Sequence, residues 1–294
     1  MRLRGTLRGV TYVLALSLLG CATTTPYIGQ GPHPHITRGR PIPLVDFLGN
    51  VFALPTKIIL FHWKMDNHAI SERTESYLVR YIDLPVSVTE GTHFSLNEYA
   101  PGRALTRLVH NRKVAWPYRL LLGFPITLIS DVLLPGRLFA GLLGGDSYNP
   151  YTDTVAIYSD LPSVALHEAG HAHDFNSRRF KGTYGLIRII PFVDLYQEFR
   201  ASDEAIDHLI EIGDRQEELA AYKILYPAYG TYVGNYLLLP GGSLAGAFLG
   251  HIFGRMKAHD RVKYYQRLDA AFDQAASSSS TQLTTQPVPA PASP

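Results

Sequence analysis

The sequence predicts an α+β fold that is rich in helices and contains a small sheet. Hydrophobic residues recur with helical spacing in several segments, whereas residues that favour strands gather in only a few short ones. In addition, 46% of the 294 residues are hydrophobic, which is enough to bury the core of one or two domains. The composition excludes a disordered chain, a coiled coil and a collagen.

The first twenty residues have the features of a targeting segment. Three arginines form a positive start, and the apolar stretch over residues 10–19 is too short to span a bilayer. The segment ends in Leu-Leu-Gly before Cys21, the only cysteine of the chain, and this end resembles the lipobox of bacterial lipoproteins. The resemblance implies that residues 1–20 are a signal peptide and that Cys21 is lipidated.

The predicted location follows from the same segment. Ala22 stands where an aspartate would signal retention in the inner membrane. The resemblance therefore implies a lipid anchor in the bacterial cell envelope, on the outer membrane facing the periplasm if the host has two membranes. Without the three leader arginines the chain has 24 basic and 25 acidic residues. It therefore lacks the excess of positive charge that is typical of a nucleic-acid-binding protein.

Composition divides the rest of the chain into three parts. Residues 21–45 are rich in Thr, Pro and Gly without apolar periodicity, so we predict a flexible tether. Residues 274–294 are of low complexity and are predicted to be disordered. The single folded domain is therefore expected over residues 46–273.

The first half of this domain contains three short predicted elements and one apolar block. Residues 71–82 have helical spacing after a polar start, residues 85–89 favour a strand, and residues 104–109 favour a short helix. The block over 118–145 is interrupted by prolines and charged residues, so a membrane-spanning helix is not expected. We predict buried core there, and a membrane-facing or substrate-facing surface is the alternative.

A predicted strand and helix follow. Residues 153–159 are rich in β-favouring residues that partly alternate with others, and we expect them to form an edge strand of the sheet. The helix is predicted over residues 162–176, because Pro162 suits a first helical turn and an apolar run comes after it.

Within this helix, His167-Glu168-Ala169-Gly170-His171 has the pattern H-E-x-x-H. At about 100° per residue the two histidines differ by about 40°, so both imidazoles can bind one metal ion. Glu168 lies on the adjacent flank, within reach of a water at the metal. Neutral imidazoles suit Zn²⁺, which activates water near neutral pH, so Zn²⁺ is the predicted cofactor and Glu168 the predicted catalytic base.

A third metal ligand is predicted on a second helix, over residues 191–211. On that helix Glu198 lies on the apolar arc that faces inward, whereas Glu204 and Glu211 lie on the solvent face. A lone carboxylate on an apolar arc needs a partner, and a metal ion supplies one. Glu198 is therefore the predicted third ligand.

Other residues near the motif have predicted supporting roles. Asp174 lies about 20° from His167 on the same helix face, so we predict that it accepts a hydrogen bond from a ligand imidazole. His173 lies about 200° from His171 and is predicted to point away from the metal. Four residues are candidates for the donor that stabilises an oxyanion, and the sequence does not choose among them: Tyr196, His208, Tyr222 and Tyr229.

The motif together with Glu198 resembles the zincin metallopeptidases of the gluzincin type. The metzincin branch is excluded, because Asp174 and Ser177 stand where its motif needs Gly and His. The string that begins at Glu198 resembles the E-x-x-A-D segment of the CAAX-prenyl-endopeptidase-like gluzincins, with Ser202 at the position of the aspartate. Asp203, one residue later, is then predicted to be the carboxylate that supports a ligand.

The resemblance implies a zincin-like domain that hydrolyses peptide bonds in protein or peptide substrates. The strand over 153–159 would hold the substrate by strand addition. Two other interpretations remain open. The first is a non-catalytic envelope lipoprotein with a structural or relic zinc site. The second is a membrane-associated scaffold that acts through the apolar blocks 118–145 and 236–254.

The second apolar block contains a regular glycine pattern. Gly246, Gly250 and Gly254 repeat every four residues, so they share one face of a predicted helix and permit close approach of another helix. We predict a tightly packed interior helix. A membrane-spanning or oligomerising helix is the alternative.

Overall fold

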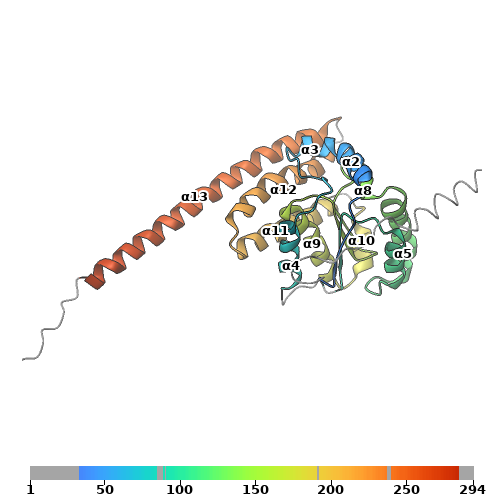
Figure 1. The fold of residues 1–294 in the computed structure, drawn as a ribbon, viewed down its shortest axis with the longest axis horizontal. Helices are drawn as coiled ribbons and strands as arrows, with labels where there is room; N and C mark the ends of the chain where they lie inside the picture. The colour runs from blue at the N-terminus through green and yellow to red at the C-terminus, as the bar shows by residue number, and fades with distance from the viewer. Residues whose placement is uncertain (1–32, 85–88, 90, 191, 237–239, 285–294) are drawn as a thin grey trace, which may run out of the picture.

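The structure is a computed structural model, and it describes residues 33–84, 89, 91–190, 192–236 and 240–284 (Figure 1). The predicted signal peptide, the lipidation site at Cys21 and most of the strand predicted over 85–89 lie outside these residues. A search of the described helices found none with both the length and the apolar character needed to cross a bilayer.

Four short strands form one mixed sheet in the order β1-β2-β4-β3. They are β1 (Ile36–Arg38), β2 (His93–Leu96), β3 (Ser147–Asn149) and β4 (Thr154–Ile157). Strands β1, β2 and β4 run parallel to one another, and β3 runs antiparallel to β4. In this register Phe94 of β2 pairs with Ile36 on one side and Val155 on the other. The predicted α+β class with a small sheet is confirmed.

Two predictions about the strands are wrong. The strand predicted over 153–159 is present as β4, but it lies between β2 and β3 and is therefore not an edge strand. The two edge strands are β1 and β3, each only three residues long. Strand β1 lies within residues 21–45, so the predicted tether is too long and the fold begins before residue 46.

The N-terminal half supplies helices of different lengths. The longer ones are α2 (Pro43–Phe52), α3 (Leu54–Ile59), α4 (Glu72–Ile82) and α5 (Pro101–His110). Helix α4 begins at the cap Ser71, whose side chain accepts a hydrogen bond from the backbone N–H of Thr74. Helices α4 and α5 confirm the helices predicted over 71–82 and 104–109.

The apolar block 118–145 forms several short helical pieces. The buried core predicted there is wrong, because six of its large side chains are more than half exposed: Leu120, Leu121, Ile129, Leu133, Leu142 and Leu143. Its first pieces follow directly on one another: α6 (Trp116–Tyr118), the π-helical turn η1 (Arg119–Gly123), α7 (Phe124–Thr127) and the π-helical turn η2 (Leu128–Leu133). Helix α8 (Gly136–Phe139) follows after Pro135.

The C-terminal half is almost entirely helical. It contains α9 (Pro162–Ser177), α10 (Lys181–Ile187), α11 (Val193–Glu211), α12 (Arg215–Asn235) and α13 (Gly242–Thr284). Helices α9 and α11 confirm the two helices predicted to carry the site. Disorder from residue 274 is wrong as far as Thr284, because no Gly or Pro ends the helix between Gly254 and Pro287.

The main core lies between one face of the sheet and the helices α4, α9, α11 and α12. Alternate residues of the two central strands are fully buried in it: Phe94, Leu96, Val155 and Ile157. The residues between them, Ser95, Thr154 and Ala156, point to the opposite face and border a cleft. The sheet therefore separates the core from the cleft.

Helices α12 and α13 pack with their backbones in contact. A Cβ atom at Gly246 would overlap the carbonyl of Gly230, and one at Gly250 would overlap the carbonyl of Tyr226. Gly254 is equally close to the carbonyl of Tyr222. The predicted tight packing of the glycine face is confirmed, and α12 is the helix that covers it. The predicted interior position is wrong, because Leu244, Phe248 and Phe253 on the other faces of α13 are more than half exposed.

Candidate metal centre

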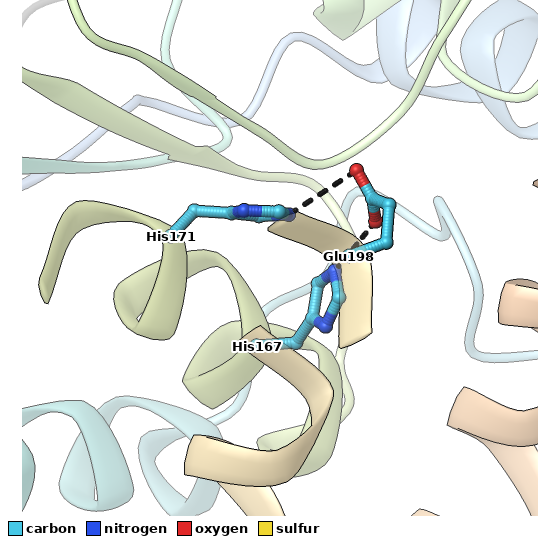
Figure 2. A group of neighbouring side chains, drawn as sticks. All are labelled: His167, His171 and Glu198. Atoms are coloured by element: carbon cyan, nitrogen blue, oxygen red, sulfur yellow. Dashed lines mark hydrogen bonds and ion pairs between the residues drawn. The ribbon is translucent and has the colours of Figure 1, made fainter. Parts of the chain in front are cut away.

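Helix α9 presents both histidines of the motif to α11. Most of the helix is buried, since it packs on the sheet as well as on α4 and α11. The imidazoles of His167 and His171 lie 4.7 Å apart between ring centroids, nearly perpendicular to each other. Figure 2 shows the side chains of both residues directed toward Glu198.

Gly170 allows α11 to approach the motif. A Cβ atom there would lie 2.9 Å from the carbonyl oxygen of Ala201 and 3.1 Å from its Cα, which is closer than a methyl group tolerates. Glu198 lies three residues before Ala201 on α11, so this contact brings its carboxylate beside the two histidines. The second variable residue of H-E-x-x-H thus has a packing role in this protein.

The three predicted ligands come together in a group that could hold a metal ion. His167 Nε2 lies 3.2 Å from Glu198 Oε2, and His171 Nε2 lies 3.4 Å from Glu198 Oε1. One ligand atom from each residue lies within 4.8 Å of the other two. Donors about 2.0–2.1 Å from a tetrahedral zinc are about 3.3 Å from one another, so the two short distances fit such an ion.

The carboxylate of Glu198 is buried, and neighbouring side chains stabilise its negative charge. Only 2% of its side chain is exposed. Burial alone would raise its pKa, but the charge of His171 and the hydrogen bonds from both imidazoles hold the pKa well below its usual value. The guanidinium of Arg188, just beyond α10, also contacts Glu198 Oε1 and lies 3.0 Å from Gln197 Oε1. The ligand is therefore charged and held in place.

Glu168 lies beside the cluster and is not one of its three members. Its side chain borders the cleft, and the residue is 7% exposed. Burial raises its pKa to about 8 against the lowering effect of His167, and the charges of Glu198 and Asp146 add to the rise. Among the described residues its carboxylate has no hydrogen-bond partner, so it is free to accept a proton from a bound molecule.

The two predicted supporting aspartates are wrong. Asp174 contacts Arg178 and the hydroxyl of Tyr184, and these two partners replace the predicted ligand imidazole. The side chain of Asp203 is 44% exposed and lies 3.9 Å from Arg200, on the outer side of α11. Asp203 is misplaced because one residue along a helix rotates a side chain by about 100°. Asp174 shares the helix face of His167 but lies seven residues, about 10 Å, further along the helix axis.

Ser202, and not Asp203, is the residue whose side chain lies beside a ligand imidazole. Its Oγ lies 3.2 Å from Nδ1 of His167, the ring nitrogen that faces away from Glu198. When Nδ1 carries the proton and donates to Ser202, Nε2 is left as the metal-binding nitrogen. Ser202 occupies the position at which the E-x-x-A-D pattern has an aspartate.

His173 points away from the cluster, as predicted. Its Nδ1 lies 2.7 Å from Glu204 Oε1, and the hydroxyl of Tyr81 bonds to the same carboxylate at 3.0 Å. Glu204 is therefore engaged elsewhere and is only partly on the solvent face. The exposed Glu211 lies at the end of α11.

The site opens into a cleft of about 450 Å³. Its wall near the cluster is formed by Glu168, His171, Arg188, Glu198 and Tyr232. Strand β3 borders the same cleft through all three of its residues. The cleft thus joins the histidine and carboxylate cluster to the β3 edge of the sheet.

Sequence reasoning missed Arg188 and Tyr232. The phenol of Tyr232 on α12 is close enough to Glu198 that the negative charge, together with burial, raises its pKa. Among the described residues that line the cleft, none is one of the four candidate oxyanion donors predicted from the sequence. Tyr229 lies one turn before Tyr232 on the same helix, but nothing local in the sequence distinguishes the two.

Comparisons with known proteins found no match. No protein-family model, no curated protein and no solved structure is similar to this chain at a significant level. The geometry of the cluster is therefore the basis for its interpretation. The residues His167, His171 and Glu198 form a largely buried group that can hold a metal ion.

Proposed function

We propose that the protein is a zinc-dependent metallopeptidase. The observation that carries the proposal is the convergence of His167, His171 and Glu198 to within 4.8 Å, with the carboxylate of Glu168 bordering the same cleft. Two histidines and a glutamate with an open fourth position are the ligand set of a catalytic zinc site, whereas structural zinc sites have four protein ligands. The fit to the H-E-x-x-H pattern supports the same assignment.

The chemistry divides between the ion and the side chains. Zinc bound to His167, His171 and Glu198 would supply Lewis acidity toward the peptide carbonyl and the attacking water. Glu168 accepts the proton of that water and passes it to the leaving amine. The hydroxyl of Tyr232 borders the cleft near Glu198 and donates a hydrogen bond to the carbonyl oxygen as negative charge develops there.

The substrate would be a protein or peptide in extended conformation. Strand β4 is covered on both sides, so strand addition is assigned to β3, whose outer edge is free and whose residues border the cleft. The lipobox ending at Cys21 favours an enzyme held by lipid in the bacterial cell envelope, on the outer membrane where the host has two. Envelope proteins are then the substrate class within reach.

The deciding experiment compares Glu168→Gln with the wild type. The substitution keeps the size of the side chain and removes its basicity. We expect normal zinc content and peptide hydrolysis reduced by about 10²–10⁴-fold, the contribution of a positioned general base. The measurements are zinc by elemental analysis and cleavage of one unfolded envelope protein by both samples.

His167→Ala is the control, because it breaks the coordination shell itself. It should lose zinc together with activity. Cleavage by Glu168→Gln at the wild-type rate would contradict the mechanism. A zinc-loaded wild type that cleaves nothing in a broad panel of unfolded proteins would favour the non-catalytic zinc lipoprotein.

A further inference from the structure

One side of the molecule exposes a large apolar surface outside the cleft. Helices α2 and α3 and the turn after α3 expose five large apolar side chains by more than half: Leu44, Phe47, Ile58, Phe61 and Trp63. Patches of this kind on soluble proteins mark interaction sites.

The first part of α13 continues this surface. It exposes four more large side chains by more than half: Leu244, Phe248, Leu249 and Phe253. The ring of His251 stacks on Phe61 at 4.4 Å, and its Nε2 lies 2.8 Å from the carbonyl oxygen of Ile59. Figure 1 shows α2, α3 and the start of α13 together along the top of the molecule. We call the exposed side chains of residues 44–63 and 244–253 the apolar face.

Charged groups are turned away from the apolar face. Between residues 41 and 63 the sequence has two charged residues. Asp46 is paired with Arg137 at 2.9 Å, and Lys57 is buried with its ammonium bonded to two backbone carbonyls. Residues 242–254 contain no charged residue. An interface with another protein ordinarily has a polar rim and about one hydrogen bond per 100–200 Å², whereas residues 41–63 and 242–254 have no unpaired charged side chain to contribute to such a rim.

We propose that the apolar face docks on a lipid bilayer and inserts its aromatic side chains below the headgroups. Trp63, followed by the exposed Lys64, has the arrangement of residues found at a membrane–water boundary. On α13 the charged residues begin at Arg255, directly after the apolar part. The face begins 23 residues after Cys21, so a lipid on that cysteine would keep it within reach of the membrane. The proposal does not depend on the zinc site.

The chain carries its own reporters for a test. Its two tryptophans are both exposed, Trp63 by 72% on the apolar face and Trp116 by 66% in α6. The full chain with Cys21→Ser is mixed with phosphatidylcholine vesicles whose acyl chains carry bromine, which quenches tryptophans that reach the hydrocarbon. With Trp116→Phe, the fluorescence of Trp63 should be quenched. Trp116 lies outside the apolar face, beside the exposed Leu120 and Leu121. With Trp63→Phe, the fluorescence of Trp116 should be quenched much less, which separates the apolar face from that second surface.

Two matched substitutions on α13 test whether the quenching of Trp63 depends on the apolar face. Phe248 and Phe272 lie on the same helix and are both 64% exposed, but only Phe248 belongs to the apolar face. In the protein that retains Trp63, Phe248→Asp should abolish the quenching, because a charge then has to enter the hydrocarbon. Phe272→Asp should leave the quenching unchanged.

Three results would overturn the proposal. The first is vesicle-bound protein in which Trp63 is not quenched, or is quenched no more than Trp116. The second is equal loss of quenching in Phe248→Asp and Phe272→Asp. The third is a blue shift of the Trp63 emission maximum that increases with protein concentration and does not depend on lipid. That result would mean that the face binds a second copy of the chain.

Discussion

Ser202 shows how a single position decides the surroundings of a ligand. Its hydroxyl is 3.2 Å from Nδ1 of His167 and fixes which ring nitrogen faces Glu198. Ser202→Ala should therefore weaken zinc binding by about tenfold, at the low end of the 10–100-fold effect of such hydrogen-bond partners. Competition with a chromogenic chelator measures this.

The control for this prediction is the neighbouring aspartate. Asp203→Ala removes a side chain that is 44% exposed and lies on the outer side of α11, so the zinc affinity should not change. A larger loss in Asp203→Ala than in Ser202→Ala would return the supporting role to Asp203.

Asp66 is a buried acid whose ionisation opposes folding. The residue is fully buried, and among the described groups neither carboxylate oxygen has a hydrogen-bond partner. Burial, and then the charge of Asp146, raise its pKa from 3.8 to about 8. The folded state therefore keeps a proton that the unfolded state releases above about pH 4, so this group lowers the stability as the pH rises from about 4 to 8.

Asp66→Asn should remove this pH dependence, since the amide does not titrate. Urea unfolding at pH 5 and at pH 8 gives the free energy of unfolding of both proteins. We expect the variant to gain stability relative to the wild type between the two pH values. If the difference between the two proteins is the same at both, Asp66 does not titrate in this range.

At the scale of elements, the contact of α9 with α11 is the one that assembles the site. Gly170→Ala adds a methyl group 2.9 Å from the carbonyl oxygen of Ala201, so α11 has to move away. Overpacking of this kind lowers the free energy of unfolding by about 1–3 kcal/mol, although alanine is the better helix former by about 1 kcal/mol. Zinc binding should weaken as well, because Glu198 moves with α11.

Thermal unfolding with and without zinc checks this prediction. If Gly170→Ala is as stable as the wild type and binds zinc equally well, the close approach of the two helices is not needed for the site.

The elements also show what the sequence can predict and what it cannot. Within one helix, the rotation of about 100° per residue relates His167 to His171 and sets Glu198 apart from Glu204, so the ligands could be predicted. Strand β3 was missed because three residues are too few for an alternating pattern to stand out, and β1 was taken for part of the tether for the same reason. Arg188 reaches the cleft from just beyond α10 and Tyr232 reaches it from α12, and only the packing of these segments brings them there.

At the scale of the whole molecule, a metal ion would join two helices of the main core. Its ligands come from α9 and α11, both of which contribute buried residues to that core. At a free zinc concentration of 100 times the dissociation constant, linkage adds about 2.7 kcal/mol to the free energy of unfolding. For a domain of this size, that corresponds to an increase in Tm of roughly 5–10 °C.

Chelation of the metal should reverse this increase, as followed by calorimetry. Glu168→Gln should show the same shift as the wild type, because it keeps the ligands. Glu198→Ala should show much less. An equal shift in all three proteins would mean that zinc binds elsewhere on the chain.

The length of α13 has a mechanical consequence. Asp269 pairs with Arg215 at the start of α12, at 2.8 Å, whereas Tyr232 borders the cleft near the other end of α12. From Asp269 the helix continues for another fifteen residues, a rod of about 22 Å (Figure 1). A tilt of about 10° at Asp269 would move its tip by roughly 4 Å. A fluorophore attached near Thr284 would therefore report small rotations of α13 by energy transfer. The contact at Asp269 and the cleft at Tyr232 are separated by most of the length of α12.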